Sequence, residues 1–247
     1  MTNKVSIARL VVEQSPSAGP GAHHRLCWVR LRGWNRTLFI LAVYIPHVGW
    51  GPYREEVLTD MDHVVNQHAK KGDCIMIIGD FNSKLPRGAP GITGKWCVHP
   101  EADTGGKHMM RTMASHGLCA ASTYFPPKGK YWKCKNKHQV RCYRWGNATY
   151  MPPQPTDPEA EMRLPRQIDY MLVSKRWMTS CRSCEVKWEP SMAKFGYRRD
   201  HGMLSMVWQF RMRQPKACER RRDFEALNSD PVAATLDYHV QWELWGN

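Results

Sequence analysis

A short apolar run that ends in polar residues constrains the fold of this chain most. Residues 74–79 (CIMIIG) carry no charged side chain, and Asp80, Phe81 and Asn82 follow directly. Such a run is typical of a strand in the buried middle of a sheet. Reactive groups in α/β sheets gather at the carboxyl ends of strands, so Asp80 and Asn82 also indicate a candidate site. An ordinary strand followed by an Asp/Asn turn is the alternative interpretation.

The neighbouring segments predict alternating strands and helices. Strands are expected over 25–31, 36–44, 167–173, 184–188 and 203–210, with the first two joined in a hairpin by a turn at 33–35. Helices are expected over 53–71 and 106–116, because apolar residues recur at helical spacing and a glycine follows each segment. Loops are expected over 86–104 and 126–166. We predict one domain over 1–212, then a basic linker and a short C-terminal helix over 213–247.

The composition indicates a basic, folded protein. The chain has 247 residues, 42% of them hydrophobic, and a formal net charge of +14. Such a charge favours a polyanionic partner, because neutralising phosphates releases counterions. The favoured partner is nucleic acid, and within that class DNA. A basic protein without such a partner remains an alternative. No apolar run reaches the roughly eighteen residues of a membrane helix, and we see no signal peptide, so we expect an intracellular location that includes the nucleus.

The nine cysteines suggest reduced thiols rather than a disulfide framework, because their number is odd and they are scattered. Cys181 and Cys184 have zinc-like spacing but lack a second pair nearby. Cys134, His138 and Cys142 lie in a basic loop. A four-ligand zinc site would have to combine these two distant groups, so buried thiols are the favoured interpretation.

Two further segments place ionisable residues beside apolar strands. Asp169 lies inside the run IDYMLV at 168–173, and a charge there is costly unless it is paired. Asp200 and His201 directly precede the strand expected from 203. A carboxylate commonly fixes the tautomer of a histidine, so we expect Asp169 to orient His201. Asp200 would then be a hard oxygen ligand suited to Mg²⁺.

In combination these motifs resemble the endonuclease/exonuclease/phosphatase superfamily. The matching segments, in order, are YIP at 44–46, GDFN at 79–82, IDYMLV at 168–173 and DH at 200–201. The chain looks most similar to the endonuclease domains of non-LTR retrotransposons, over roughly residues 4–244. The resemblance implies a four-layer α/β (α+β) sandwich, in which two mainly antiparallel or mixed sheets are flanked by helices. It also implies Mg²⁺-dependent (or Mn²⁺-dependent) phosphodiester hydrolysis.

The resemblance implies a role for each matching position. Asp80 would orient or deprotonate the attacking water, and Asn82 would hold the water and the phosphate. His201, oriented by Asp169, would stabilise the developing charge. Asp200 would ligate the metal, and Tyr44 would donate a hydrogen bond to the phosphate.

The chain departs from the family at its beginning. The family starts with strands that carry an Asn or Asp and then the Glu that is its main metal ligand, and this chain starts at the strands that follow. We therefore expect an N-terminally truncated domain, with Glu13 as the nearby candidate for the missing ligand. An incomplete product, a decayed element and a chain completed by another polypeptide are three open alternatives. The competing functional class is a non-catalytic nucleic-acid-binding or scaffold protein.

A basic loop with interleaved aromatic residues is a second candidate for nucleic-acid contact. Residues 128–145 (KGKYWKCKNKHQVRCYRW) could grip phosphates and stack on unpaired bases. A solvated loop anchored by its aromatic side chains fits the same residues equally well.

Overall fold

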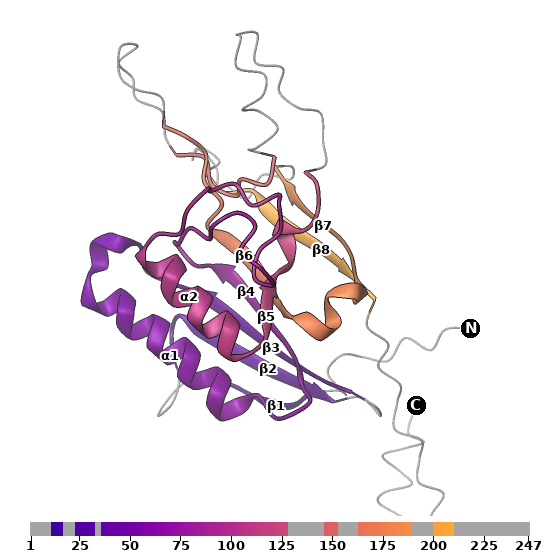
Figure 1. Cartoon of the computed structure of the whole chain (residues 1–247). Helices are drawn as coiled ribbons and strands as arrows, with labels where there is room; N and C mark the ends of the chain where they lie inside the picture. Colours follow the sequence, from indigo (N-terminus) through magenta and orange to yellow (C-terminus); the bar gives the residue numbers. More distant parts are fainter. Residues whose placement is uncertain are drawn as a thin grey trace, which may run out of the picture. The chain divides into compact units, whose positions relative to one another are not determined.

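The computed structural model describes residues 11–16, 23–32, 36–127, 146–152, 163–188 and 200–209, all within the predicted domain over 1–212. These residues form a six-stranded sheet in the order β1-β2-β3-β4-β6-β5 and a two-stranded sheet of β7 and β8 (Figure 1). The strands are β1 (Val11–Gln14), β2 (Leu26–Arg32), β3 (Thr37–Tyr44), β4 (Cys74–Asp80), β5 (Leu118–Ala120), β6 (Asp169–Ser174), β7 (Cys181–Lys187) and β8 (Met203–Trp208). The predicted linker and helix over 213–247 lie outside the described residues.

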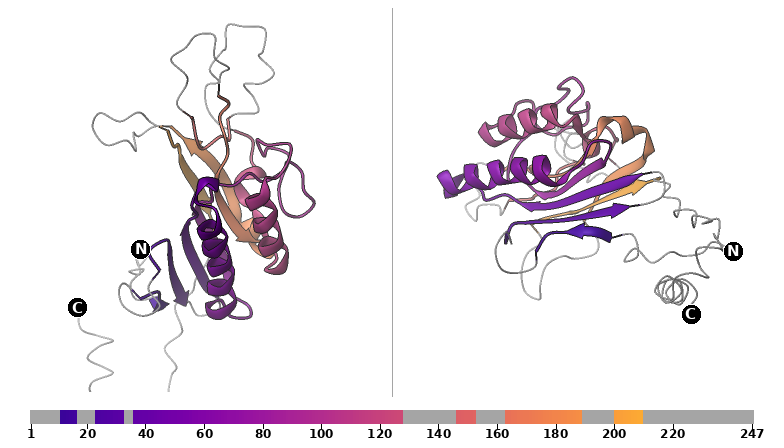
Figure 2. Two further views of the ribbon diagram at one scale, coloured as in Figure 1. Left: turned by 90° about the vertical axis from the view of Figure 1, so that its left-hand side faces the viewer. Right: turned by 90° about the horizontal axis from the view of Figure 1, so that it is seen from below.

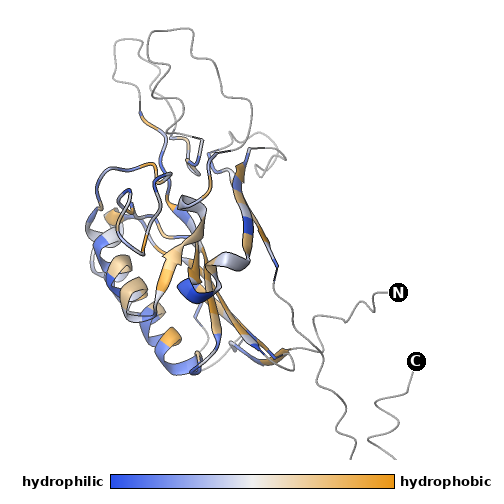
Figure 3. Cartoon of the chain, turned by 45° about the vertical axis from the view of Figure 1, so that its right-hand side comes forward, coloured by the Kyte–Doolittle hydropathy of each residue, from blue (hydrophilic) through white to orange (hydrophobic). Residues whose placement is uncertain are grey.

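Two α-helices pack on one face of the larger sheet (Figure 2). They are α1 (Pro52–His68) and α2 (Thr104–Ser115). Proline suits the first turn of α1, where a backbone N–H has no helical partner. At the start of α2 the Asp103 carboxylate accepts a hydrogen bond from the N–H of Gly106. Both helices carry bands of hydrophobic and hydrophilic residues (Figure 3), as expected where one side covers a sheet.

The β3 side chains show how the layers are held together. Phe39 and Leu41 pack in the core that α1 and α2 share with the sheet. Leu38 and Ile40, on the opposite face, pack in a second core with residues of β7 and β8. The predicted mixed α/β fold, with two packed sheets and flanking helices, is thus confirmed. The described residues show three layers, and a helix layer outside β7 and β8 is not among them.

Most predicted elements occur, with shifted ends. The hairpin of β2 and β3 is confirmed, with Leu26 opposite Val43, while its turn at 33–35 lies outside the described residues. α1 ends at His68, three residues before the expected 71, because Ala69 adopts an extended conformation. β7 begins at Cys181 instead of 184. The strand β5 was not predicted, because a segment of three residues is too short to show a periodic pattern of apolar residues. The predicted loop over 126–166 is described only at 126–127, 146–152 and 163–166.

The glycine before the polar end of β4 is required by close packing against β3. Gly79 has a φ of +143°, and a Cβ at this position would lie 1.9 Å from the carbonyl oxygen of Val43. Only glycine fits such a conformation and such an approach. Glycine at this position therefore lets β4 pair with β3 up to Asp80. In the described part of the chain, no helix is long and apolar enough to cross a membrane.

Candidate active site

Three adjacent strands place polar side chains at one end of the larger sheet. Asp80, the last residue of β4, is opposite Tyr44 of the parallel β3 and opposite Asp169 of the antiparallel β6. The N–H of Ile45 donates to the carbonyl oxygen of Asp80 across 2.8 Å, which continues the β3–β4 pairing past the strand end. Neighbouring strands lie about 5 Å apart, so these residues share one small region.

Asn82 is held against Asp80 by a tight local turn. Its backbone N–H donates to Oδ1 of Asp80 at 2.8 Å, and its side-chain Nδ2 donates to Oδ2 of the same carboxylate at 3.1 Å. Nδ2 also donates to the carbonyl oxygen of Ile45 at 3.0 Å. Asn82 has a φ of +44°, a left-handed conformation that asparagine tolerates better than most residues. The Asp80 carboxylate is therefore fixed in orientation before any ligand arrives.

Asp169 and His201 form the expected carboxylate–histidine pair. Nδ1 of His201 lies 3.2 Å from Oδ2 of Asp169. The hydroxyl of Thr149 accepts from the N–H of Asp169 at 3.0 Å, and Tyr150 pairs with His201 in an isolated β-bridge. The Tyr150 and His201 rings lie 5.0 Å apart. Because Asp169 engages Nδ1, Nε2 is the nitrogen that can act on a substrate.

The charges in this site perturb one another. Asp80, Asp169 and His201 each offer a ligand atom, and these atoms all lie within 4.8 Å of one another. Burial, followed by the nearby Asp169 charge, raises the pKa of Asp80 from 3.8 to about 6. The hydrogen bond that His201 donates to the Asp169 carboxylate raises the pKa of His201 above its usual value. Such mutual shifts are typical of functional sites, and a divalent cation would relieve the repulsion between the acids.

The other two predicted site residues lie at the margin of this group. Asp200 is exposed, and its backbone carbonyl oxygen accepts a hydrogen bond from Met151. Its charge acts to raise the pKa of both Asp80 and His201, so it is close, although the three-residue group does not include it. The Tyr44 side chain is 53% exposed, with the Arg25 guanidinium carbon 4.8 Å from its ring centroid. The metal-binding role of Asp200 and the phosphate contact of Tyr44 stay predictions.

A buried arginine that the sequence analysis missed supports the turn after β4. Arg54 is 3% exposed, and Nη2 donates to the hydroxyl of Ser83 at 2.6 Å and to the carbonyl oxygen of Asn82 at 3.3 Å. Nε donates to the carbonyl oxygen of Pro46 at 3.1 Å. Arg54 thus joins the segments after β3 and β4. Its position three residues before the buried Val57, on the apolar face of α1, was the sequence signal that could have identified it.

Glu13, the candidate metal ligand near the start of the chain, is engaged in ion pairs away from Asp80. Its Oε1 accepts from Nζ of Lys70 at 2.9 Å and lies 3.5 Å from Nη1 of Arg30. Arg30 in turn forms a buried ion pair with Asp73, which directly precedes β4. Asp80 ends the seven-residue β4, roughly 20 Å away along the strand. We therefore reject Glu13 as a metal ligand for this site.

The thiols of the Cys181–Cys184 pair behave as core side chains. Both are buried, and burial raises the pKa of Cys181 to about 11 and that of Cys184 to about 12. The described residues that could hold a metal ion include no cysteine, whereas 134–142 lies outside the described residues.

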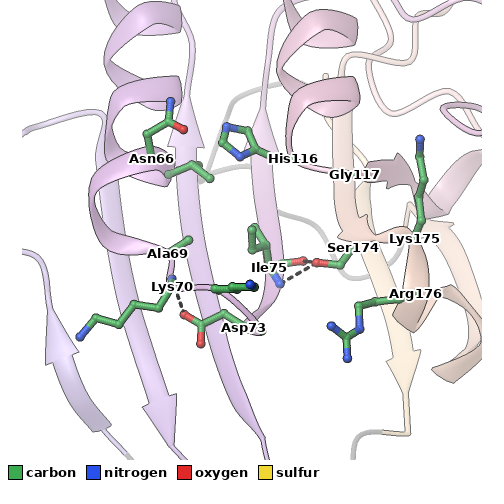
Figure 4. A pocket seen from close by; sticks show the side chains of 13 residues that line it. Asn66, Ala69, Lys70, Asp73, Ile75, His116, Gly117, Ser174, Lys175 and Arg176 are labelled. Carbon is green, nitrogen blue, oxygen red and sulfur yellow. Dashed lines mark hydrogen bonds between the residues drawn. The ribbon is translucent and has the colours of Figure 1, made fainter.

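A basic hollow lies at the opposite end of the sheet from the acids. It measures about 510 Å³ and lies between the ends of α1 and α2 and the start of β4 (Figure 4). Its basic lining residues are Lys70, Lys71, Lys175 and Arg176. Helix C-termini carry partial negative charge, which accounts for cations there. This hollow is therefore no extension of the Asp80 site.

Comparison with known proteins gives distant matches. No family model matches the chain. Craniofacial development protein 2 of Bos taurus is 25% identical over 212 residues, and the match covers 83% of this chain. The same protein of Tragulus javanicus is 25% identical over 210 residues. The chain spans about 30% of the length of these curated relatives.

The matched solved structures include members of the superfamily that the sequence resembles. The 3′ phosphatase NExo from Neisseria, bound to a product DNA hairpin, has a TM-score of 0.47 and 15% identity, covering 75% of this chain and 65% of that one. An AP endonuclease from Archaeoglobus fulgidus has a TM-score of 0.47 and 15% identity, covering 81% and 70%. The endonuclease domain of TRAS1, a telomere-specific non-LTR retrotransposon, has a TM-score of 0.44 and 15% identity, covering 78% and 63%.

Proposed function

We propose that the chain hydrolyses phosphodiester bonds with the help of a divalent cation, and that its substrate is DNA, which it nicks as retroelement endonucleases do. The observation that carries the proposal is the convergence of Asp80, Asp169 and His201 within 4.8 Å, with Asn82 bonded to Asp80. The net charge of +14 favours a polyanionic substrate over a neutral one.

The site residues divide the chemistry between them. A water molecule held by Asn82 and Asp80 attacks phosphorus, and its proton passes to the Asp80 carboxylate. The bond from phosphorus to the leaving sugar oxygen breaks, and that oxygen takes a proton from solvent. His201, whose pKa is raised by Asp169, donates a hydrogen bond from Nε2 to the phosphate oxygen that gains charge.

The acids fit a hydrated Mg²⁺ or Mn²⁺ better than a softer metal. Mg²⁺ in nucleases binds through one or two carboxylates, several waters and substrate phosphate oxygens. Asp200 is the carboxylate that we propose binds it, because Asp169 is engaged with His201 and Asp80 takes the proton of the attacking water. A bound cation would neutralise the charge that develops on the phosphate.

A non-catalytic nucleic-acid-binding protein is the second candidate. The three-residue group contains a histidine already bonded to one of its two carboxylates, so few oxygen ligands are left for Mg²⁺. A protein that had lost a metal-binding carboxylate would keep this geometry and bind DNA without cutting it.

Incubation of the purified chain with supercoiled plasmid and Mg²⁺ distinguishes the two candidates. We expect nicking that is lost in Asp80→Ala and in His201→Ala. His116→Ala is the matched control, because His116 also pairs with an aspartate, Asp62, at 3.0 Å but lies at the far end of the sheet. Plasmid binding without nicking would support the binding protein, and nicking that survives His201→Ala would refute the proposed site.

A further inference from the structure

Exposed apolar side chains gather beside the candidate active site. Three of the seven exposed large hydrophobic residues in the described part of the chain lie within residues 44–50, namely Tyr44 at 53%, Val48 at 78% and Trp50 at 52%. Exposed apolar side chains that form a contiguous patch are a feature of surfaces that bind a ligand or a partner. We call Tyr44, Trp50 and Tyr53, together with Arg25, the aromatic cluster.

The rings of the aromatic cluster are arranged around one cation. The guanidinium carbon of Arg25 lies 4.8, 5.7 and 5.4 Å from the ring centroids of Tyr44, Trp50 and Tyr53. Nε of Arg25 donates to the Tyr53 hydroxyl at 3.1 Å, and the indole N–H of Trp50 donates to Nε2 of His47 at 3.0 Å. Because the Tyr53 hydroxyl and the Trp50 indole N–H are bonded locally, these two rings hold their orientation, and Trp50 and Tyr44 are exposed to a ligand.

The aromatic cluster is continuous with the residues that would hold the scissile phosphate. Tyr44 is opposite Asp80 in the β3–β4 register, and Ile45 accepts the hydrogen bond from Nδ2 of Asn82. The backbone then leads through a short 3₁₀ helix, η2 (Val48–Trp50), into α1. A strand of nucleic acid with one phosphate at Asp80 would therefore place a neighbouring nucleotide over these rings.

The chemistry of the aromatic cluster favours an unpaired base over other occupants. Flat aromatic faces next to a guanidinium bind bases by stacking and cation–π contact. A base inside a duplex offers no free face, whereas an unstacked base does. A protein partner would need roughly 800 Å² of surface on this chain, far more than three rings provide. The charge of +14 also complements the phosphates on either side of the base.

We propose that the aromatic cluster stacks on an unpaired base next to the phosphate at Asp80, so that the chain prefers nucleic acid with an unstacked nucleotide there. This inference rests on the proposed function, since it places the nucleic acid by its scissile phosphate. Trp50 is the main stacking residue, because indole has the largest ring face and half of this side chain is exposed.

The test measures binding without cleavage, on the full chain carrying His201→Ala. Fluorescence anisotropy compares a labelled duplex with the same duplex carrying one unpaired base. We expect Trp50→Ala to weaken binding of the bulged duplex roughly 5- to 100-fold, the range for loss of one base–aromatic stack. Binding of the fully paired duplex should change less than about twofold, as for a neutral surface substitution.

Two control variants separate stacking from general loss of surface or fold. Trp50→Phe keeps an aromatic face and should retain most of the affinity for the bulged duplex. Val207→Ala removes another exposed apolar side chain, 55% exposed and on β8, and should have no effect. Equal losses for the two duplexes, or no loss in Trp50→Ala, would overturn the stacking proposal. A wild-type chain that never nicks plasmid would refute the proposed activity and leave this binding difference measurable.

Discussion

Replacing Asp80 with asparagine should stabilise the protein at neutral pH, although it removes the proposed catalytic base. Its carboxylate is largely withdrawn from water and lies near the charge of Asp169, and these two effects raise its pKa from 3.8 to about 6. A carboxyl whose pKa is higher in the folded state binds its proton more tightly there. Ionising it above pH 6 therefore costs folding free energy, and this cost disappears as the pH falls toward 4.

The size of the effect follows from the pKa shift. About two pKa units at 1.36 kcal/mol each give an upper limit of ~3 kcal/mol. The asparagine keeps one acceptor for Asn82 but loses the other, at a cost of about 1 kcal/mol. The net gain above pH 7 should be about 1–2 kcal/mol, which raises Tm by roughly 2–8 °C for a domain of this size.

Urea unfolding and thermal melts between pH 4 and pH 8 in EDTA would measure this gain. Asp62→Asn is the matched control, because Asp62 pairs with a histidine, His116, at 3.0 Å but lies away from the Asp80 site. The gain in Asp80→Asn should be full at pH 8 and absent at pH 4. A variant that is less stable than wild type at pH 8, or a gain that does not vary with pH, would refute the claim of repulsion between the acids. Added Mg²⁺ should raise the Tm of wild type more than that of Asp80→Asn.

Three further changes test the parts that hold the site. Arg54→Met should cost about 3–5 kcal/mol in urea unfolding, because it leaves two backbone carbonyls and a hydroxyl without their buried donor. Gly79→Ala should cost about 3 kcal/mol or more, whereas Gly72→Ala, also at positive φ but with open space around it, should cost about 1 kcal/mol. Asp169→Asn should destabilise the metal-free protein more at pH 6 than at pH 9. Asp169 raises the pKa of His201 in the folded protein, and this adds to the free energy of unfolding. The added stability is full below pH 6.5, the pKa of an unfolded histidine, and is lost as the pH rises past the pKa of His201 in the folded protein. Equal losses at both pH values would show that the Asp169–His201 pair is not charged.

The sequence predicted the structure correctly where the pattern of apolar residues and the cost of burying a charge indicate the same arrangement. The run at 74–79 predicted a central strand that ends at Asp80, and the family resemblance implied that Asp80 and Asp169 share one site, as the register of β4 and β6 shows. The partner expected for Asp169 was His201, and the two side chains lie 3.2 Å apart. These predictions succeeded because a buried acid needs a partner and the fold supplies few candidates.

The supports of the site could not be predicted in the same way. Helical spacing could have shown that Arg54 is buried, but it could not show that Arg54 bonds to the carbonyl oxygens at 46 and 82. Thr149 accepts from two backbone N–H groups of a strand nearly twenty residues away in sequence, within a segment that looked like loop alone. Glu13 was misplaced for a related reason, since its ion pairs with Lys70 and Arg30 depend on strand order in the sheet.

The most direct measurement for the site as a whole is a double-mutant cycle on the rate of plasmid nicking. Asp169→Asn and His201→Ala should each lower the rate by about 10²–10⁴-fold. If Asp169 acts through His201 in a single phosphodiesterase site, the double variant should be no slower than His201→Ala alone. Losses that multiply, or a wild-type rate no higher than that of the variants, would contradict this account.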